Sequence, residues 1–158
     1  MVPVKTYKSY WDDLKIELGI DRVLMVSDES ELQQLIKEVV DGEKILVAVI
    51  PSSDTEAPDI DNIEEVDSCF LFILQKVSFQ DLTRDELLDV QEFTQELISS
   101  IKERMTEDCA NVNTDTPGSL LMRRLVIDKM HTDPEYNYLG CTGWSLSFQL
   151  KSIGFNHA

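Results

Sequence analysis

Residues Asp54–Leu74 read DTEAPDIDNIEEVDSCFLFIL, a dense run of acidic side chains followed at once by an apolar run. The first fourteen, Asp54–Asp67, hold seven acidic residues and no Lys or Arg. Cys69–Leu74 is entirely apolar, and a short apolar run of this kind favours a buried strand. The sequence therefore predicts a true hydrophobic core entered from one strongly anionic surface loop. Neither part carries a catalytic signature.

The apolar segments on the two sides of this loop predict a pair of strands. Lys44–Ile50 (KILVAVI) is β-branched and nearly all apolar, which favours a strand buried on both faces. Pro51 is expected to end it. Ser68–Val77 is predicted to be the second strand. Because no helix fits between the two, we expect them to pair as antiparallel neighbours across the loop.

Two N-terminal stretches have the apolar spacing of amphipathic helices. The first covers about residues 6–18, and Gly19 suits the left-handed position after a helix. The second begins with a capping-box spacing, in which Asp28 is followed by Glu31 three residues later. Gly42 is a suitable end for this second helix.

A third, longer helix is predicted in the middle of the chain. Thr83 and Glu86 form another capping-box spacing, and apolar residues recur at helical intervals to about Thr106. A helix of this length extends about 30 Å, which is enough to lie across a whole sheet.

After this helix, Leu120–Met130 is predicted to be a strand, Thr132–Gly143 a long connection and Trp144–Ile153 the last strand. The element order is then α-α-β-β-α-β-β, in a single α+β domain over residues 1–158. We expect a four-stranded, mainly antiparallel sheet covered on one face by the long helix, with the two N-terminal helices in the same layer. An alternative counts Val23–Val26 as a strand and makes a βαβ unit.

The chain is strongly acidic, with 14 Lys and Arg against 30 Asp and Glu and a formal charge of −16. Such a charge repels nucleic acid backbones and anionic membranes, so neither is an expected partner. Residues 1–117 hold 27 acidic and 10 basic residues, whereas residues 118–158 hold 3 and 4. This asymmetry could bring one end of a subunit to the other end of a neighbour. The simpler interpretation is a solvated acidic surface.

Three cysteines, Cys69, Cys109 and Cys141, are an odd number without CxxC or Cys/His spacing, which argues against a disulfide framework and against a zinc site. The sequence has no apolar run of the length that spans a membrane, and its first residues lack a signal-peptide core. A reducing, cytoplasmic location is the expectation.

Residues that could form a catalytic site are few in this sequence. The only histidines are His131 and His157, and a role for His131 beside Cys141 or Ser119 is a minor hypothesis. Phosphate-binding glycine motifs do not occur in the sequence. We therefore predict a protein that is not an enzyme and has no cofactor.

The acidic stretch fails as an EF-hand. Counting from Asp59, the sixth position is Glu64 where Gly is needed, and the twelfth is Phe70 where Glu is needed. Weak cation binding by the dense carboxylates remains an alternative to a plain solvated loop. Arg123 and Arg124 are adjacent, so on the predicted strand they would point to opposite faces, one of them toward an interface or an acidic partner.

The order of elements, together with several short segments, resembles the tail-terminator or tail-completion proteins of long-tailed phages and prophages, in a phage-like family of gut Bacteroidetes. The resemblance covers most of residues 7–151. The chain departs from it at the long connection after Thr132 and in its high negative charge. The segments that carry it are YWDDL (Tyr10–Leu14), ILVAVIP (Ile45–Pro51), DNIEEVD (Asp61–Asp67), CFLFIL (Cys69–Leu74), ELISSIKERM (Glu96–Met105) and GWSLSFQL (Gly143–Leu150).

This resemblance implies a structural role in a virion rather than catalysis. Proteins of this kind form a ring, often of six subunits, that caps the tail tube and joins it to the head or its connector. The expected partners are further copies of this chain and a tail tube or head-connector protein. The alternative is an acidic interaction module, similar to an immunity or inhibitor protein, that binds a basic partner. The residues expected at the interface are Asp59, Asp61, Glu64, Glu65, Asp67, Arg123 and Arg124.

Overall fold

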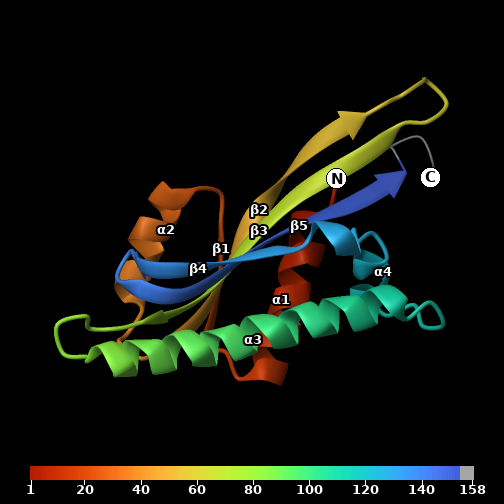
Figure 1. Cartoon of the computed structure of the whole chain (residues 1–158). Coiled ribbons are helices and arrows are strands. Elements are labelled where there is room, and N and C mark those ends of the chain that lie inside the picture. Colours follow the sequence, from red (N-terminus) through yellow and green to blue (C-terminus); the bar gives the residue numbers. More distant parts are fainter. Residues whose placement is uncertain (154–158) are drawn as a thin grey trace.

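The computed structural model describes residues 1–153, which form a five-stranded mixed sheet with helices on both faces (Figure 1). The strand order across the sheet is β1-β2-β3-β5-β4. The α+β class is as predicted, whereas the strand number and order differ. The elements are α1 (Val4–Leu18), β1 (Arg22–Val26), α2 (Glu29–Leu35), η1 (Ile36–Glu38), β2 (Lys44–Glu56), β3 (Glu64–Lys76), α3 (Arg84–Ala110), α4 (Pro117–Met122), η2 (Ile127–Lys129), β4 (His131–Tyr138) and β5 (Cys141–Ile153).

β1 is one of two strands that the main prediction lacked, and it confirms the βαβ alternative. β1 pairs in parallel with β2, from Arg22 opposite Ile45 to Val26 opposite Val49. Two parallel neighbours need a crossover connection, and α2 supplies it. The Asp28 side chain caps α2 by accepting a hydrogen bond from the Glu31 backbone N–H at 2.9 Å.

The predicted antiparallel pair β2 and β3 is present but is longer than expected. Pro51 does not end β2; the register shifts between Val49 and Ser52, and the strand continues to Glu56. β1 ends at the partner of Val49, so Pro51 lies on a free edge where a missing N–H costs no ladder hydrogen bond. Most of the acidic stretch is therefore strand, and only residues 57–63 form the connecting turn.

The C-terminal third differs most from the prediction. The strand predicted at Leu120–Met130 is wrong, because α4 and η2 occupy this region. Thr116 caps α4 by accepting a hydrogen bond from the Ser119 N–H at 3.2 Å. The predicted long connection after Thr132 contains β4, which forms an antiparallel hairpin with β5.

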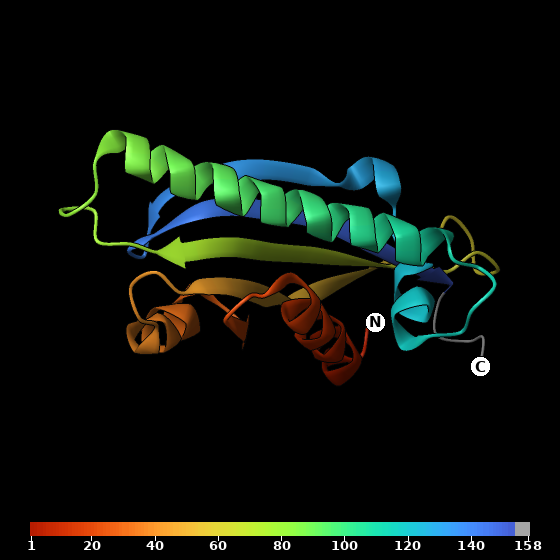
Figure 2. The ribbon, with the colours of Figure 1, turned by 90° about the horizontal axis from the view of Figure 1, so that it is seen from below.

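The helices divide between the two faces of the sheet. α1 and α3 cross the same face (Figure 2), as predicted, and their apolar residues share one core cluster with the sheet. α2 lies on the opposite face, where Leu32 and Ile36 pack with Val47 and Phe72. The prediction that both N-terminal helices lie in one layer is therefore wrong for α2.

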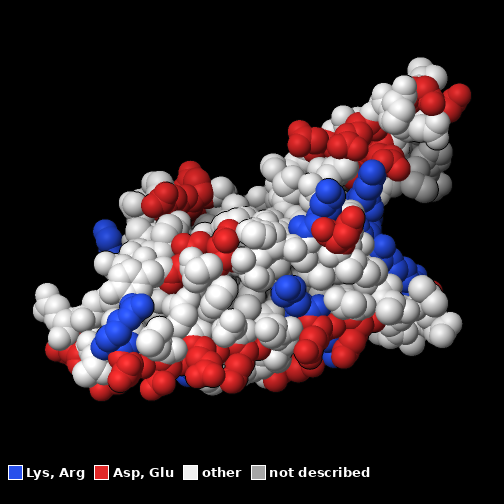
Figure 3. All heavy atoms as spheres, viewed as in Figure 1, with Lys and Arg blue, Asp and Glu red and all other residues white. Residues whose placement is uncertain are grey.

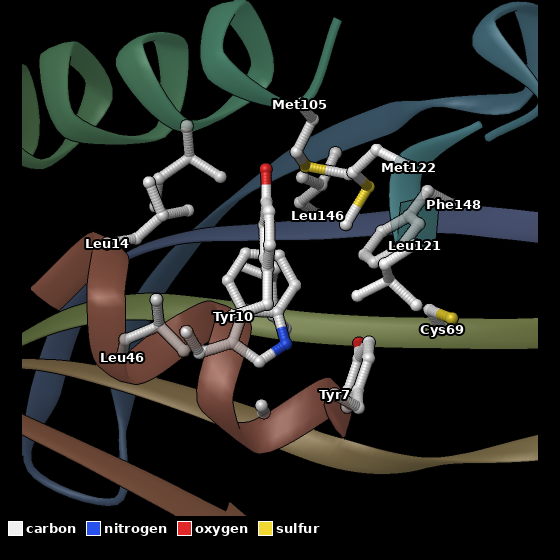
Figure 4. Packing of buried hydrophobic residues seen from close by; sticks show 14 of the residues in the cluster. Tyr7, Tyr10, Leu14, Leu46, Cys69, Met105, Leu121, Met122, Leu146 and Phe148 are labelled. Carbon is white, nitrogen blue, oxygen red and sulfur yellow. The ribbon is translucent and has the colours of Figure 1, made fainter. Parts of the chain in front are cut away.

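The main core is centred on the aromatic side chains of α1, which lie between the sheet and α3 (Figure 4). Trp11 is fully buried and makes edge-to-face contacts with Tyr7, Tyr10 and Phe148. The Tyr10 hydroxyl donates to Asp108 at 2.7 Å, which joins α1 to α3. Burial, with the hydrogen bond to Asp108, raises the pKa of Tyr10.

The Gln91 side chain attaches α3 to the β4–β5 hairpin. Its Nε2 donates to the Gly143 carbonyl at 2.5 Å, and its Oε1 accepts from the Thr142 hydroxyl at 2.6 Å. The Trp144 indole N–H donates to the Gln91 backbone carbonyl at 3.0 Å. α3 begins with the predicted capping box.

We expect Gln91→Ala to lower the free energy of unfolding by about 1–3 kcal/mol, because it removes the side-chain donor of the Gly143 carbonyl and leaves the Thr142 hydroxyl with only its bond to the Glu135 carbonyl. Urea unfolding followed by circular dichroism measures this. Glu92→Ala is the matched control, since Glu92 is the exposed neighbour on the same helix. Equal losses in the two variants would contradict a specific role for Gln91.

Candidate interaction surface

The acidic stretch lies mostly on a projecting β-hairpin, which we call the arm and define as residues 52–68. It consists of the distal half of β2, the first part of β3 and the turn between them. β5 pairs with β3 along the arm as a third strand of the same sheet, with Gln149 opposite Ser68 and Ile153 opposite Glu64. In Figure 1 these strands extend beyond the rest of the sheet, and in Figure 3 acidic side chains cover much of the arm.

Two of the predicted interface residues, Asp59 and Asp61, lie at the exposed tip of the arm. The Asp59 carboxylate accepts hydrogen bonds from the Asp61 N–H at 2.9 Å and from the Asn62 side-chain amide at 2.9 and 2.8 Å. These bonds, the one from Asn62 first, lower the pKa of Asp59, so it stays ionised at neutral pH. They also fix the tip turn, which presents Ile60 with 85% of its surface exposed.

The other three predicted carboxylates form ion pairs within the chain or are buried. Glu64 forms an ion pair with Lys151 of β5 at 2.7 Å, and this contact raises the pKa of Lys151. Glu65 contacts the amino group of Met1. Asp67 is only 1% exposed, so it lies on the inner face rather than in the exposed loop that the sequence suggested.

Arg123 and Arg124 follow α4 in a turn. Of the two side chains, only that of Arg123 forms hydrogen bonds and an ion pair within residues 1–153. The Arg123 guanidinium donates to the backbone carbonyls of the α3–α4 loop, at 2.8 Å to Thr114 and 3.2 Å to Val112, and pairs with Asp115 at 3.0 Å. Arg124 is half-buried and makes no ion pair with any residue of the range 1–153.

Arg124 lines an apolar groove of about 260 Å³ between the start of α1 and α4. This groove was not predicted, because Leu120–Met130 was expected to be a strand and α4 was not expected. The signal was present, since Thr116 followed by Pro117 is the usual start of a helix. The other residues lining the groove are Pro3, Thr6, Pro117, Leu120 and Leu121.

A second hollow of about 440 Å³ lies on the open part of the sheet face that carries α2. Serine hydroxyls from Ser68 and Ser147 and the ring of Phe70 line it, and Lys129 is the one charged side chain among its lining residues. No histidine or carboxylate lines this hollow to act as a base for these hydroxyls.

The residues considered for catalysis are far apart in the fold. His131 begins β4 opposite Ser147 and is exposed beside Asp133, at 3.0 Å. Cys141 is buried at the first residue of β5, and Ser119 is buried in α4. His157 lies outside the described residues.

Within residues 1–153 no group of three or more His, Cys, Asp or Glu side chains could hold a metal ion. No helix in that range is both long and apolar enough to cross a membrane.

No protein-family model, no curated protein and no solved structure matches this chain. Its function must therefore be argued from the arm, the groove and the distribution of charge.

The cysteines provide a test of the packing around these surfaces. Burial raises the pKa of Cys69 to about 12 and that of Cys141 to about 11, so neither forms an appreciable fraction of reactive thiolate near neutral pH. Cys109 is half-exposed near the end of α3. We expect a thiol reagent at pH 8 to modify Cys109 first, and the other two only when the protein unfolds.

Mass spectrometry of the labelled native protein measures this order, and Cys109→Ser should remove the fast phase. Fast labelling of Cys69 in the native protein would show that α1 does not seal this part of the core.

Proposed function

We propose that this chain is a non-enzymatic structural protein of a phage or phage-derived tail, which caps the tail tube or joins it to the head by assembling into a ring. The observation that carries the proposal is the arm, a paired β-hairpin that extends beyond the body and holds charged side chains at its tip. Its length and charge suit contact with another protein molecule. The resemblance of the sequence to tail-terminator proteins supplies the class of assembly.

A ring built head to tail needs two different patches on each subunit, and they must be complementary. The arm tip is acidic, whereas Arg124 follows α4 and Lys129 lies in η2, and neither forms an ion pair within residues 1–153. Opposite charges on the two patches would select the correct register and speed association. An acidic inner wall of the ring would also let DNA pass without binding, because such a wall has no cationic side chains that could replace the counterions of the DNA phosphates.

Light scattering and negative-stain electron microscopy of the purified protein test this proposal. We expect rings at low ionic strength, and dissociation near 1 M salt, where the Debye length falls to about 3 Å. The matched control replaces the arm tip, residues 55–65, with a two-residue Asn-Gly turn, which keeps the β2–β3 hairpin but removes the projection. A wild-type protein that stays monomeric at high concentration and low salt, and does not bind tail tube protein, would contradict the proposal.

One observation favours a second candidate, an acidic module that binds a basic partner. The outer side of α3 presents a row of exposed carboxylates at helical spacing, visible along that helix in Figure 3. Gene neighbourhood separates the two candidates: tail tube and tape-measure genes support the ring, and a toxin gene supports the module. The exposed row comprises Asp85, Asp89, Glu92, Glu96, Glu103 and Glu107.

A further inference from the structure

The arm tip combines an apolar side chain with two charges. Ile60 is 85% exposed, and it lies between Asp59 and Asp61 in a turn that the Asp59 hydrogen bonds hold in place. A single exposed apolar residue is ordinary on a protein surface. Here, however, it stands at the tip of the arm, which extends beyond the rest of the sheet (Figure 1).

The groove between α1 and α4 has the complementary character. Its walls are apolar apart from Thr6 and Arg124, and Leu120 in its wall is 48% exposed. Its volume of about 260 Å³ is below the range of about 300–1,000 Å³ that is typical of small-molecule sites. It therefore suits one inserted side chain better than a free ligand. Arg124 brings a positive charge to the groove without an ion-pair partner in residues 1–153.

We propose that Ile60 at the arm tip of one copy inserts into the α1–α4 groove of the next copy, and that Asp59 or Asp61 pairs with Arg124 beside it. This inference rests on the proposed function, since it identifies the contact that joins neighbouring subunits. It uses different patches on the two copies, as a head-to-tail assembly requires.

The occupant is a second copy because the acidic tip and Arg124 are complementary in charge, and because strand pairing keeps the tip extended within its own chain. Both strands of the arm are held straight by pairing, Glu56 opposite Glu64 and Glu64 opposite Ile153 of β5. Bending the tip back toward α4 would break this ladder. The arm can meet the groove of a neighbouring molecule without bending, and that groove offers both apolar side chains and the positive charge of Arg124.

Ile60→Asp tests the apolar part of the contact. Sedimentation velocity at low salt measures the association constant of each variant. We expect Ile60→Asp to weaken self-association about tenfold or more, the effect of losing one buried aliphatic side chain at an interface. The matched control is Ile16→Asp, because Ile16 is 81% exposed on α1, away from the lining of the groove. We expect this control to associate like the wild type.

Charge reversal tests the polar part of the contact. Arg124→Glu should weaken association and make it less sensitive to salt, and Asp61→Lys, which leaves the hydrogen bonds of the Asp59 carboxylate in place, should do the same. Mixing these two variants should restore association between them, because each then supplies the charge that the other lacks. Circular dichroism spectra and melting curves check that every variant is folded.

The outcomes separate this inference from the proposed function. Rings that form equally well with Ile60→Asp would overturn the contact and leave the ring intact. An assembly that depends on Ile60 and Arg124 but closes as a dimer would support the contact and overturn the ring. A wild-type protein that remains a monomer would overturn both.

Discussion

Gly143→Ala is expected to abolish the native fold or reduce its stability severely. Gly143 lies on β5 opposite Leu74 of β3, in the middle of the sheet. A Cβ atom at this position would lie 2.0 Å from the Ile73 carbonyl oxygen and 3.0 Å from the Leu74 Cα. Both are backbone atoms of a central strand, so no side-chain rotation relieves the clash. We expect a loss at or above the upper end of the about 1–3 kcal/mol that overpacking usually costs.

Urea unfolding and far-ultraviolet circular dichroism measure the effect. Gly42→Ala is the control, because a Cβ there meets no atom within 4 Å and the only cost is its positive φ of 90°. That cost is about 1–2 kcal/mol. A Gly143→Ala protein as stable as the control would mean that β3 and β5 separate more easily than their pairing indicates.

The elements that the sequence predicts well are those whose local pattern agrees with their tertiary role. β2 and β3 have continuous apolar runs because both faces of their inner halves are covered. α3 has a capping box and a long apolar stripe. The elements that were missed lack such agreement. β4 is a polar edge strand with Pro134 in it, so neither its composition nor its periodicity suggests a strand.

The arm was missed for a different reason. Acidic residues are poor strand formers, so Asp54–Asp67 was expected to be a loop. In the fold, β5 pairs with β3 as far as Glu64, the first residue of β3, and this pairing holds the arm extended. The Glu64–Lys151 ion pair joins the same two strands. Pairing with a strand some 80 residues away in the chain is not visible in a local window.

The candidate site could be predicted in part. The acidic tip with Asp59 and Asp61 is exposed, as expected. Asp67 was expected to lie with them, although its position two residues before Cys69 already placed it on the inner face of a strand. Nothing in the sequence distinguishes Arg123 from Arg124, because the carbonyl groups that hold Arg123 come together only when the α3–α4 loop folds.

Trp11→Ala is expected to lower the free energy of unfolding by about 3–5 kcal/mol, the usual cost of truncating a large buried aromatic side chain. Trp11 is fully buried, and its ring contacts Tyr7, Tyr10 and Phe148. A domain of this kind is stable by about 5–15 kcal/mol in total, so this one change removes a large share of it. The α1–α4 groove should be lost as well, because Pro3 and Thr6 of its lining are held in place by the packing of α1.

Trp11→Phe and Ile16→Ala are the matched controls for this prediction. The Trp11 indole N–H has no hydrogen-bond partner among residues 1–153, so phenylalanine removes an unpaired buried donor while it keeps most of the packing. We expect Trp11→Phe to cost less than Trp11→Ala, because the phenyl ring leaves a smaller cavity. Ile16 is 81% exposed on the same helix, and its replacement should change stability by no more than about 0.5 kcal/mol. Chemical unfolding of the three variants gives these values. If Trp11→Ala cost no more than Ile16→Ala, α1 would contribute little to the core, and the groove could not depend on it.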